Sequence, residues 1–338
     1  MKARPFVCFS KGNLSRLPIV SVALAACALL TLLPGAGPVH SAAALPPVKI
    51  GAAGPYSGDL SKIGLDGLNA IKMAVEEANA AGGVRGRKIE IVEADDAGDS
   101  SKAILVAEKL AMDRAVLGVV GPMNSSTAEA ALPTYQRAGL PIISQSATKP
   151  SLTEMGYKVM HRICPRDDAQ GPASAKFVVD VLKAKNVYII DDKTAYGQGL
   201  SDEVEAALKA SGIKTVRSQI TLEDRDFSPI LTRVKAARPD LLYLGLANPA
   251  QAASIIKQAA GLGISVRFMG GDGLKEKDQL IAGSAGLAEG MYVTTIGRDI
   301  TEVPEAAEFI RKFEGKFGAM SIFSGQTYEA TNILIDAM

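Results

Sequence analysis

Short apolar runs alternate with longer segments of helical periodicity along the chain from Val48 onward. Leu65, Leu68, Ile71 and Val75 lie three or four positions apart, which is the spacing of one buried helix face. The apolar runs predict strands over residues 48–53, 89–94, 116–120, 140–143, 186–190, 215–220, 241–244, 266–269 and 291–293. The periodic segments predict helices over residues 58–80, 100–112, 125–138, 170–184, 199–210, 227–237, 250–260 and 305–317. This alternation is typical of an α/β fold in which helices cover both faces of parallel sheets.

Two segments that contain charge and proline, residues 160–168 and 296–304, interrupt this series. We expect the chain to cross there between an N-terminal lobe (residues 45–165 and 297–338) and a C-terminal lobe (residues 166–296). A cleft between two lobes is the natural place for a small ligand, and such lobes hinge shut around it.

The first 44 residues have the composition of a secretory signal peptide. Basic residues (Lys2, Arg4, Lys11 and Arg16) precede an apolar run at 17–33 and a small-residue stretch at 41–44. We therefore expect a periplasmic protein that begins near Leu45. The alternative is a lipid anchor on Cys27, because Leu-Ala-Ala-Cys at 24–27 resembles a lipoprotein cleavage site.

Charge and cysteine usage narrow the function classes. The formal net charge of +1 becomes 1 − 4 = −3 once a leader with four basic and no acidic residues is removed, and nucleic acid is then not an expected partner. Cys8 and Cys27 lie in the leader, so Cys164 alone remains and no internal disulfide is expected.

Two hydroxyl-rich stretches carry the candidate chemistry. Residues 124–127 (Asn-Ser-Ser-Thr) and 144–148 (Ser-Gln-Ser-Ala-Thr) each follow an apolar run. Neutral donors and free backbone N–H groups at one edge of a sheet suit a reversibly held carboxylate better than phosphates. This pattern predicts binding of a small anionic or zwitterionic group.

The sequence gives little evidence for an enzyme active site or a metal site. His161 is the one histidine after the leader, and Gly-Gln-Gly at 197–199 has Asp202 where a dinucleotide fingerprint has its third glycine. The acidic pairs at 95–96 and 191–192 are spaced for neither a calcium loop nor a zinc cluster. We expect no enzyme, no cofactor and no metal.

An ordered set of short motifs resembles the periplasmic leucine/isoleucine/valine-binding proteins of ABC transporters. The set covers nearly the whole chain after the leader. It comprises residues 48–58, 64–70, 79–83, 95–97, 125–127, 146–148, 191–199 and 268–273. The resemblance implies the type I periplasmic-binding-protein fold, with two Rossmann-like lobes, three crossings and an amino acid held in the cleft between them.

The same resemblance implies a ligand site. Ser125 and Thr148 would give hydroxyls to the ligand, the backbone of Ser146 beside Ala147 would act as acceptor, Tyr196 would cover the ligand, and Asp272 would face its ammonium group. Each residue also has a structural reading: a helix cap for Ser125, turn residues for Thr148 and Asp272, and a packed aromatic for Tyr196.

Several positions depart from the family pattern. Ile63 and Ala247 stand where relatives often have aromatic residues, and Asp272 replaces a usual Glu. Gly98 and Asn124 stand where some relatives have two bonded cysteines. We therefore expect a pocket wall of a different shape.

The last segment also departs from the pattern. Residues 328–338 look helical and stop without a cap, whereas relatives continue through further helices and strands. We expect a truncated chain with an incomplete first lobe, apolar surface left uncovered and weak stability.

Two functions from different classes follow. The first is an extracytoplasmic receptor that captures a branched-chain or related amino acid and delivers it to a membrane permease. The alternative is a sensory or regulatory module of the same fold that binds an amide, urea-like or aromatic compound.

Overall fold

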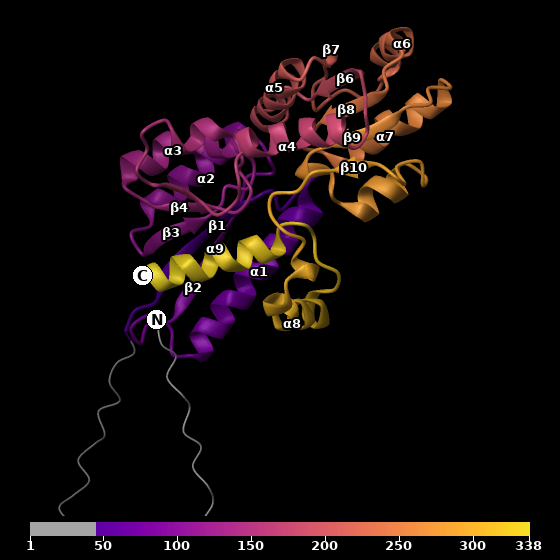
Figure 1. Cartoon of the computed structure of the whole chain (residues 1–338). Helices are drawn as coiled ribbons and strands as arrows, with labels where there is room; N and C mark the ends of the chain where they lie inside the picture. Colours follow the sequence, from indigo (N-terminus) through magenta and orange to yellow (C-terminus); the bar gives the residue numbers. More distant parts are fainter. Residues whose placement is uncertain (1–44) are drawn as a thin grey trace, which may run out of the picture. The chain divides into compact units, whose positions relative to one another are not determined.

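Two parallel five-stranded sheets organise the part of the chain that the computed structural model describes, residues 45–338 (Figure 1). The expected signal peptide and its lipidated alternative at Cys27 lie outside the described residues. The first sheet has the order β2 (Ile89–Asp95), β1 (Val48–Gly54), β3 (Val116–Val120), β4 (Ile142–Ser144) and β5 (Met160–Arg162). The second has the order β10 (Tyr292–Val293), β9 (Arg267–Gly270), β8 (Leu241–Gly245), β6 (Asn186–Asp191) and β7 (Lys214–Gln219).

Helices cover both faces of the first sheet, because its strands carry apolar side chains on each face. On one face, α1 (Ser61–Ala80) and α9 (Ser324–Ala337) lie side by side and bury Leu68, Ile71 and Leu334 against β1 and β3 (Figure 1). On the other face, α2 (Ser100–Met112) and α3 (Ser125–Ala138) pack through small residues and Leu110.

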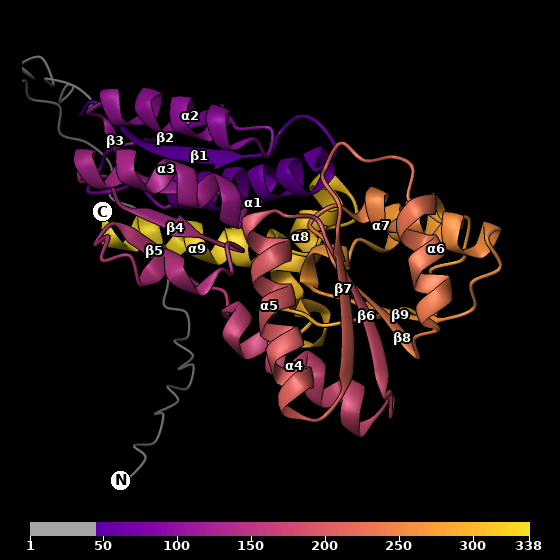
Figure 2. The same ribbon diagram turned by 90° about the horizontal axis from the view of Figure 1, so that it is seen from above.

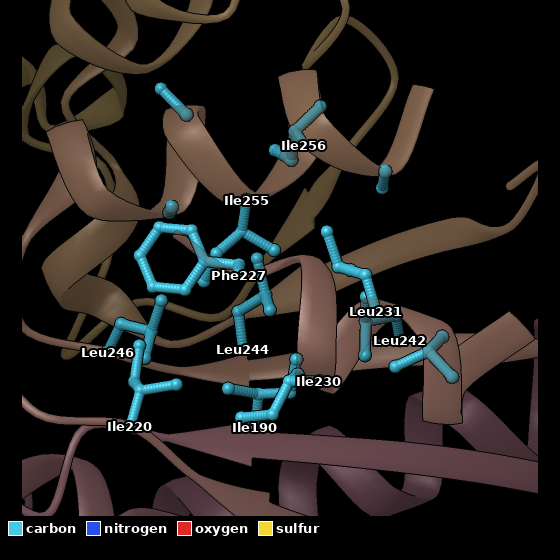
Figure 3. Packing of buried hydrophobic residues seen from close by; sticks show 14 of the residues in the cluster. Ile190, Ile220, Phe227, Ile230, Leu231, Leu242, Leu244, Leu246, Ile255 and Ile256 are labelled. Atoms are coloured by element: carbon cyan, nitrogen blue, oxygen red, sulfur yellow. The ribbon is translucent and has the colours of Figure 1, made fainter. Parts of the chain in front are cut away.

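The second sheet has the same three-layer arrangement (Figure 2). One face packs against α4 (Asp167–Asp180) and α5 (Ala195–Ala210), and the other against α6 (Ser228–Ala237) and α7 (Pro249–Gly261). Figure 3 shows the hydrophobic core between the second sheet and the helices α6 and α7, in which Leu242 and Leu244 of β8 contact Phe227, Leu231 and Ile255. The α/β class and the parallel sheets predicted from the sequence are thus confirmed.

The remaining elements are short or lie near the end of the chain. An aromatic group of Phe309, Phe313, Phe317 and Tyr328 joins α8 (Ala307–Phe317) to α1 and α9, with Phe309 and Tyr328 ring centroids 4.7 Å apart. Single helical turns occupy Pro150–Thr153, Asp272–Leu274, Ile300–Glu302 and Pro304–Ala306, and a π-helical turn occupies Asp278–Ala282.

Three predicted helix starts were placed too late. The helix α4 begins at Asp167 rather than residue 170, α5 at Ala195 rather than 199, and α9 at Ser324 rather than 328. Acidic residues in a first turn favour a helix start, and the Thr194 side chain caps α5 by accepting from the Gly197 amide. In the sequence, the charged residues at 166–168 and the glycines at 197 and 199 favoured a later helix start.

A buried carboxylate sits where the chain passes from β5 to α4. Asp167 has no exposed surface, and neither of its oxygen atoms has a hydrogen-bond partner within residues 45–338. Burial raises the pKa of this carboxyl to about 7. The Thr148 hydroxyl lies close by but outside hydrogen-bonding geometry, and it lowers the pKa only in part. The negative charges of Asp272 and Glu203 raise the pKa further, whereas the positive charge of Arg162 lowers it.

Replacing Leu334 tests how much α9 contributes to the first sheet. Leu334 is buried against Gly118, where an added Cβ atom would lie 2.5 Å from the leucine Cδ1 atom. We expect Leu334→Ala to lower the free energy of unfolding by about 2–5 kcal/mol. The neighbouring Ile333 is 41% exposed, and Ile333→Ala should cost less than about 0.5 kcal/mol. Urea unfolding of both variants measures the difference, and equal losses would show that α9 is not held by this contact.

A second prediction concerns Asp167 and pH. Because its pKa is higher in the folded state, the folded protein keeps a proton that the unfolded chain releases, so stability falls as pH rises from about 4 to about 7. Asp167→Asn removes this loss and should stabilise the protein by up to about 4 kcal/mol above pH 7.

The gain should be larger at pH 8 than at pH 5, as measured by thermal unfolding. The adjacent Asp168 is exposed and pairs with Arg166, so Asp168→Asn should give no such gain. A gain for Asp167→Asn that is independent of pH would contradict burial of the charge as its cause.

Candidate functional site

The hydroxyl-rich stretches lie at the carboxyl ends of β3 and β4, as the sequence predicted. Asn124 is the N-cap of α3 and Ser125 is its first helical residue, so the reading of Ser125 as the helix cap is wrong. The Ser125 hydroxyl accepts a hydrogen bond from the Lys149 amide at 3.2 Å instead. This contact joins the two stretches.

The second stretch is held by its neighbours. The Ser146 hydroxyl donates to the Met123 carbonyl at 2.9 Å, and the Arg162 Nη1 atom donates to the carbonyl oxygens of Ala147 and Lys149 at 3.0 and 2.8 Å. Thr148 is fully buried, and its hydroxyl has no partner among residues 45–338. The loop is therefore fixed mainly through its backbone.

Tyr196 and Asp272 form the opposite wall. The Tyr196 hydroxyl donates to Asp272 Oδ1 at 2.8 Å and accepts from the Gly273 amide at 3.2 Å. A Cβ atom on Gly271 would lie 2.5 Å from this hydroxyl, so the close approach needs glycine there. Burial raises the pKa of Asp272, which is 2% exposed, and the hydrogen bond from Tyr196 offsets part of the shift.

These residues surround a small cavity of about 30 Å³, which we call the inner cavity. Four of the six predicted site residues line it, namely Ser125, Ser146, Tyr196 and Asp272. Ala147 and Thr148 are fully buried and do not line it. Its other walls are formed by Leu60, Ile63, Met123, Asn124, Ala247, Gly273 and Phe323.

The inner cavity combines one charged group with hydroxyls and apolar walls. Asp272 is the sole carboxyl group that lines it within the described residues, and Ser125 at the start of α3 provides a hydroxyl beside a helix N-terminus. A carboxylate on one side and neutral donors on the other can hold the two ends of a zwitterion.

A second, larger space of about 680 Å³, the outer cavity, adjoins the first. Both cavities are lined by Leu60, Asn124, Ser125, Tyr196 and Ala247. Two hydrogen bonds beside the outer cavity connect elements of the two sheets: the Ala195 amide donates to the Ser126 hydroxyl, and the Asn248 amide group donates to Asp59, both at 2.9 Å.

Three apolar wall residues were missed by the sequence reasoning. Leu60 and Met123 lie in loops, and Phe323 precedes α9, far along the chain from the other site residues. Single apolar residues in loops carry no periodic signal, so only the tertiary structure reveals them. Ile63 and Ala247, expected as changed wall positions, do line the inner cavity.

The acidic pairs have structural roles. Asp95 accepts hydrogen bonds from the amides of Tyr56, Ser57 and Ala97, and Asp191 pairs with Arg217 at 2.7 Å. Within residues 45–338 no group of three or more acidic, His or Cys side chains is arranged for a metal ion. No helix in this part of the chain combines the length and apolar character needed to cross a membrane.

Comparison with protein-family models identifies the family of this chain. The model for periplasmic binding proteins matches residues 47–338. An amino acid binding protein of Pseudomonas aeruginosa is 37% identical over 273 residues, which span 80% of this chain and 72% of the relative. A leucine-, isoleucine-, valine-, threonine- and alanine-binding protein from the same organism is 34% identical over 290 residues, spanning 85% and 76%.

Solved structures agree with the fold. A leucine binding protein from Thermotoga maritima superimposes with a TM-score of 0.79 at 28% identity, over 86% of this chain and 82% of that one. A branched-chain amino acid transporter substrate binding protein from Streptococcus pneumoniae, in complex with isoleucine, has a TM-score of 0.79 at 29% identity, over 86% and 83%. The type I periplasmic-binding-protein fold predicted from the motifs is confirmed, and the chain belongs to the periplasmic binding protein family.

Proposed function

We propose that this protein is the extracytoplasmic solute-binding receptor of an ABC transporter and captures a branched-chain or related amino acid. The observation that carries the proposal is the buried Asp272 carboxylate, held by Tyr196 on one wall of a cavity whose other wall carries Ser125 and Ser146. The names of the related proteins, which include binders of leucine, isoleucine and valine, support the ligand class.

In this proposal the ligand ammonium group faces Asp272. Its Oδ1 atom already accepts from Tyr196, and we assign the Oδ2 atom to the ligand. A cation beside a buried carboxylate lowers the carboxyl pKa again, so ligand binding and ionisation of Asp272 support each other.

The ligand carboxylate faces the start of α3. The Ser125 hydroxyl and the first backbone N–H groups of this helix are suited to a single negative charge. Thr148 would join them only if the loop at 146–148 moves, because its hydroxyl is fully buried. The first carbon atoms of the ligand side chain would contact Leu60, Ile63 and Phe323.

The proposed role also includes export, lobe closure and docking on a membrane permease. The periplasmic binding protein family implies a location outside the cytoplasm, and we propose export by the leader at residues 1–44. We further propose that the lobes (residues 45–165 with 297–338, and residues 166–296) close on the ligand and dock on a membrane permease. The relatives are named as binding proteins rather than enzymes, so we assign no catalytic role.

A ligand screen tests the proposal. With amino acids, short amides, urea and benzoate at millimolar concentration, a branched-chain amino acid should raise the midpoint of thermal unfolding. Ligand at a hundred times its dissociation constant stabilises by about 2.7 kcal/mol. A rise with amides or urea alone would favour the sensory module instead, and no rise with any amino acid would contradict the amino acid receptor.

Asp272→Asn tests the assignment of the ammonium group. The asparagine keeps the volume and can still accept from Tyr196, but it lacks the charge. Loss of a charge-assisted hydrogen bond should weaken amino acid binding roughly 10- to 100-fold. Asp168→Asn removes an exposed carboxylate that lines neither cavity and should leave the dissociation constant unchanged. Equal affinities for Asp272→Asn and the unmodified protein, by titration calorimetry, would place the ammonium group elsewhere.

A further inference from the structure

Asn124 stands at the N-cap of α3 yet does not cap the helix. Asparagine is among the preferred N-cap residues because its side-chain oxygen accepts from an amide in the first turn. Here the Asn124 side chain makes no such bond, although the backbone has the extended conformation of a cap. Its Oδ1 atom is buried without any hydrogen-bond partner among residues 45–338.

The side chain of Asn124 lies at the junction of the two cavities. Asn124 lines both the inner and the outer cavity, together with Leu60 and Ala247. A Cβ atom added to Gly98 would lie 4.0 Å from Asn124 Oδ1, so the absence of a side chain at Gly98 leaves room beside the amide. An unpaired buried polar atom is costly. Because the Asn124 residue as a whole is only partly buried, rotation of its side chain toward a hydrogen-bonding ligand group would remove that cost.

The sizes of the cavities place the ligand side chain at this junction. About 30 Å³ is room for about two water-sized groups, which is less than an aliphatic side chain needs. The outer cavity shares five lining residues with the inner one and presents polar residues such as Ser57, Ser100 and Ser126. A side chain that extends from the amino acid head therefore passes Asn124 and enters polar surroundings.

We propose that Asn124 is a specificity residue that hydrogen-bonds the side chain of the ligand. The site then prefers amino acids with a hydroxyl or carboxamide side chain over aliphatic amino acids of the same shape. This inference rests on the proposed receptor function and narrows its ligand class.

Two isosteric pairs test it: threonine against valine, and asparagine against leucine. Titration calorimetry of the purified protein should give dissociation constants roughly 5- to 100-fold lower for the polar member of at least one pair. Asn124→Leu keeps the volume and removes the amide, so the preference should disappear or reverse. Asn332→Leu, the same change on α9 away from both cavities, should leave the preference intact.

The unliganded variant supplies an independent readout. Because the Asn124 side chain makes no capping bond and its Oδ1 atom is unpaired, Asn124→Leu should unfold at the same or a higher temperature than the unmodified protein. Valine and leucine binding as tightly as threonine and asparagine would overturn the inference and leave the receptor function standing. Failure of all four amino acids to bind would overturn both.

Discussion

Parallel strand pairing is the constraint on which this structure depends. Every strand in both sheets runs parallel to its neighbours, so successive strands of a sheet are joined by crossovers that return the chain to the edge at which the previous strand began. The carboxyl ends of the strands and the first turns of the helices consequently gather at one edge of each sheet. Ser125 after β3 and Asp272 after β9 owe their positions to this rule.

The same constraint explains what the sequence could predict. Apolar runs flanked by periodic segments located most strands, and the hydroxyls after β3 and β4 were found because they follow such runs. Four of the six residues assigned from the family resemblance line the inner cavity. A site built at the ends of regular elements therefore leaves a local sequence signal.

The features that were missed depend on distant contacts. Phe323 reaches the inner cavity from the segment before α9, and nothing in its neighbourhood marks it. The burial of Asp167 was equally hidden, since a carboxylate in a run of charge reads as exposed until the fold places it at the start of α4. Asn124 has the sequence of an ordinary helix cap, and only the side-chain geometry shows that it does not act as one.

Asp192 and Asp272 show how one residue type serves two purposes. Both are 2% exposed. Asp192 accepts from the Thr194 amide and hydroxyl through Oδ1 and from the Ala247 amide through Oδ2, so it stabilises a loop and has little capacity left. Asp272 accepts from the Tyr196 hydroxyl through Oδ1 and lines a cavity. Its burial costs free energy that the Tyr196 bond offsets only in part, and a cationic group in the cavity would offset more of this cost.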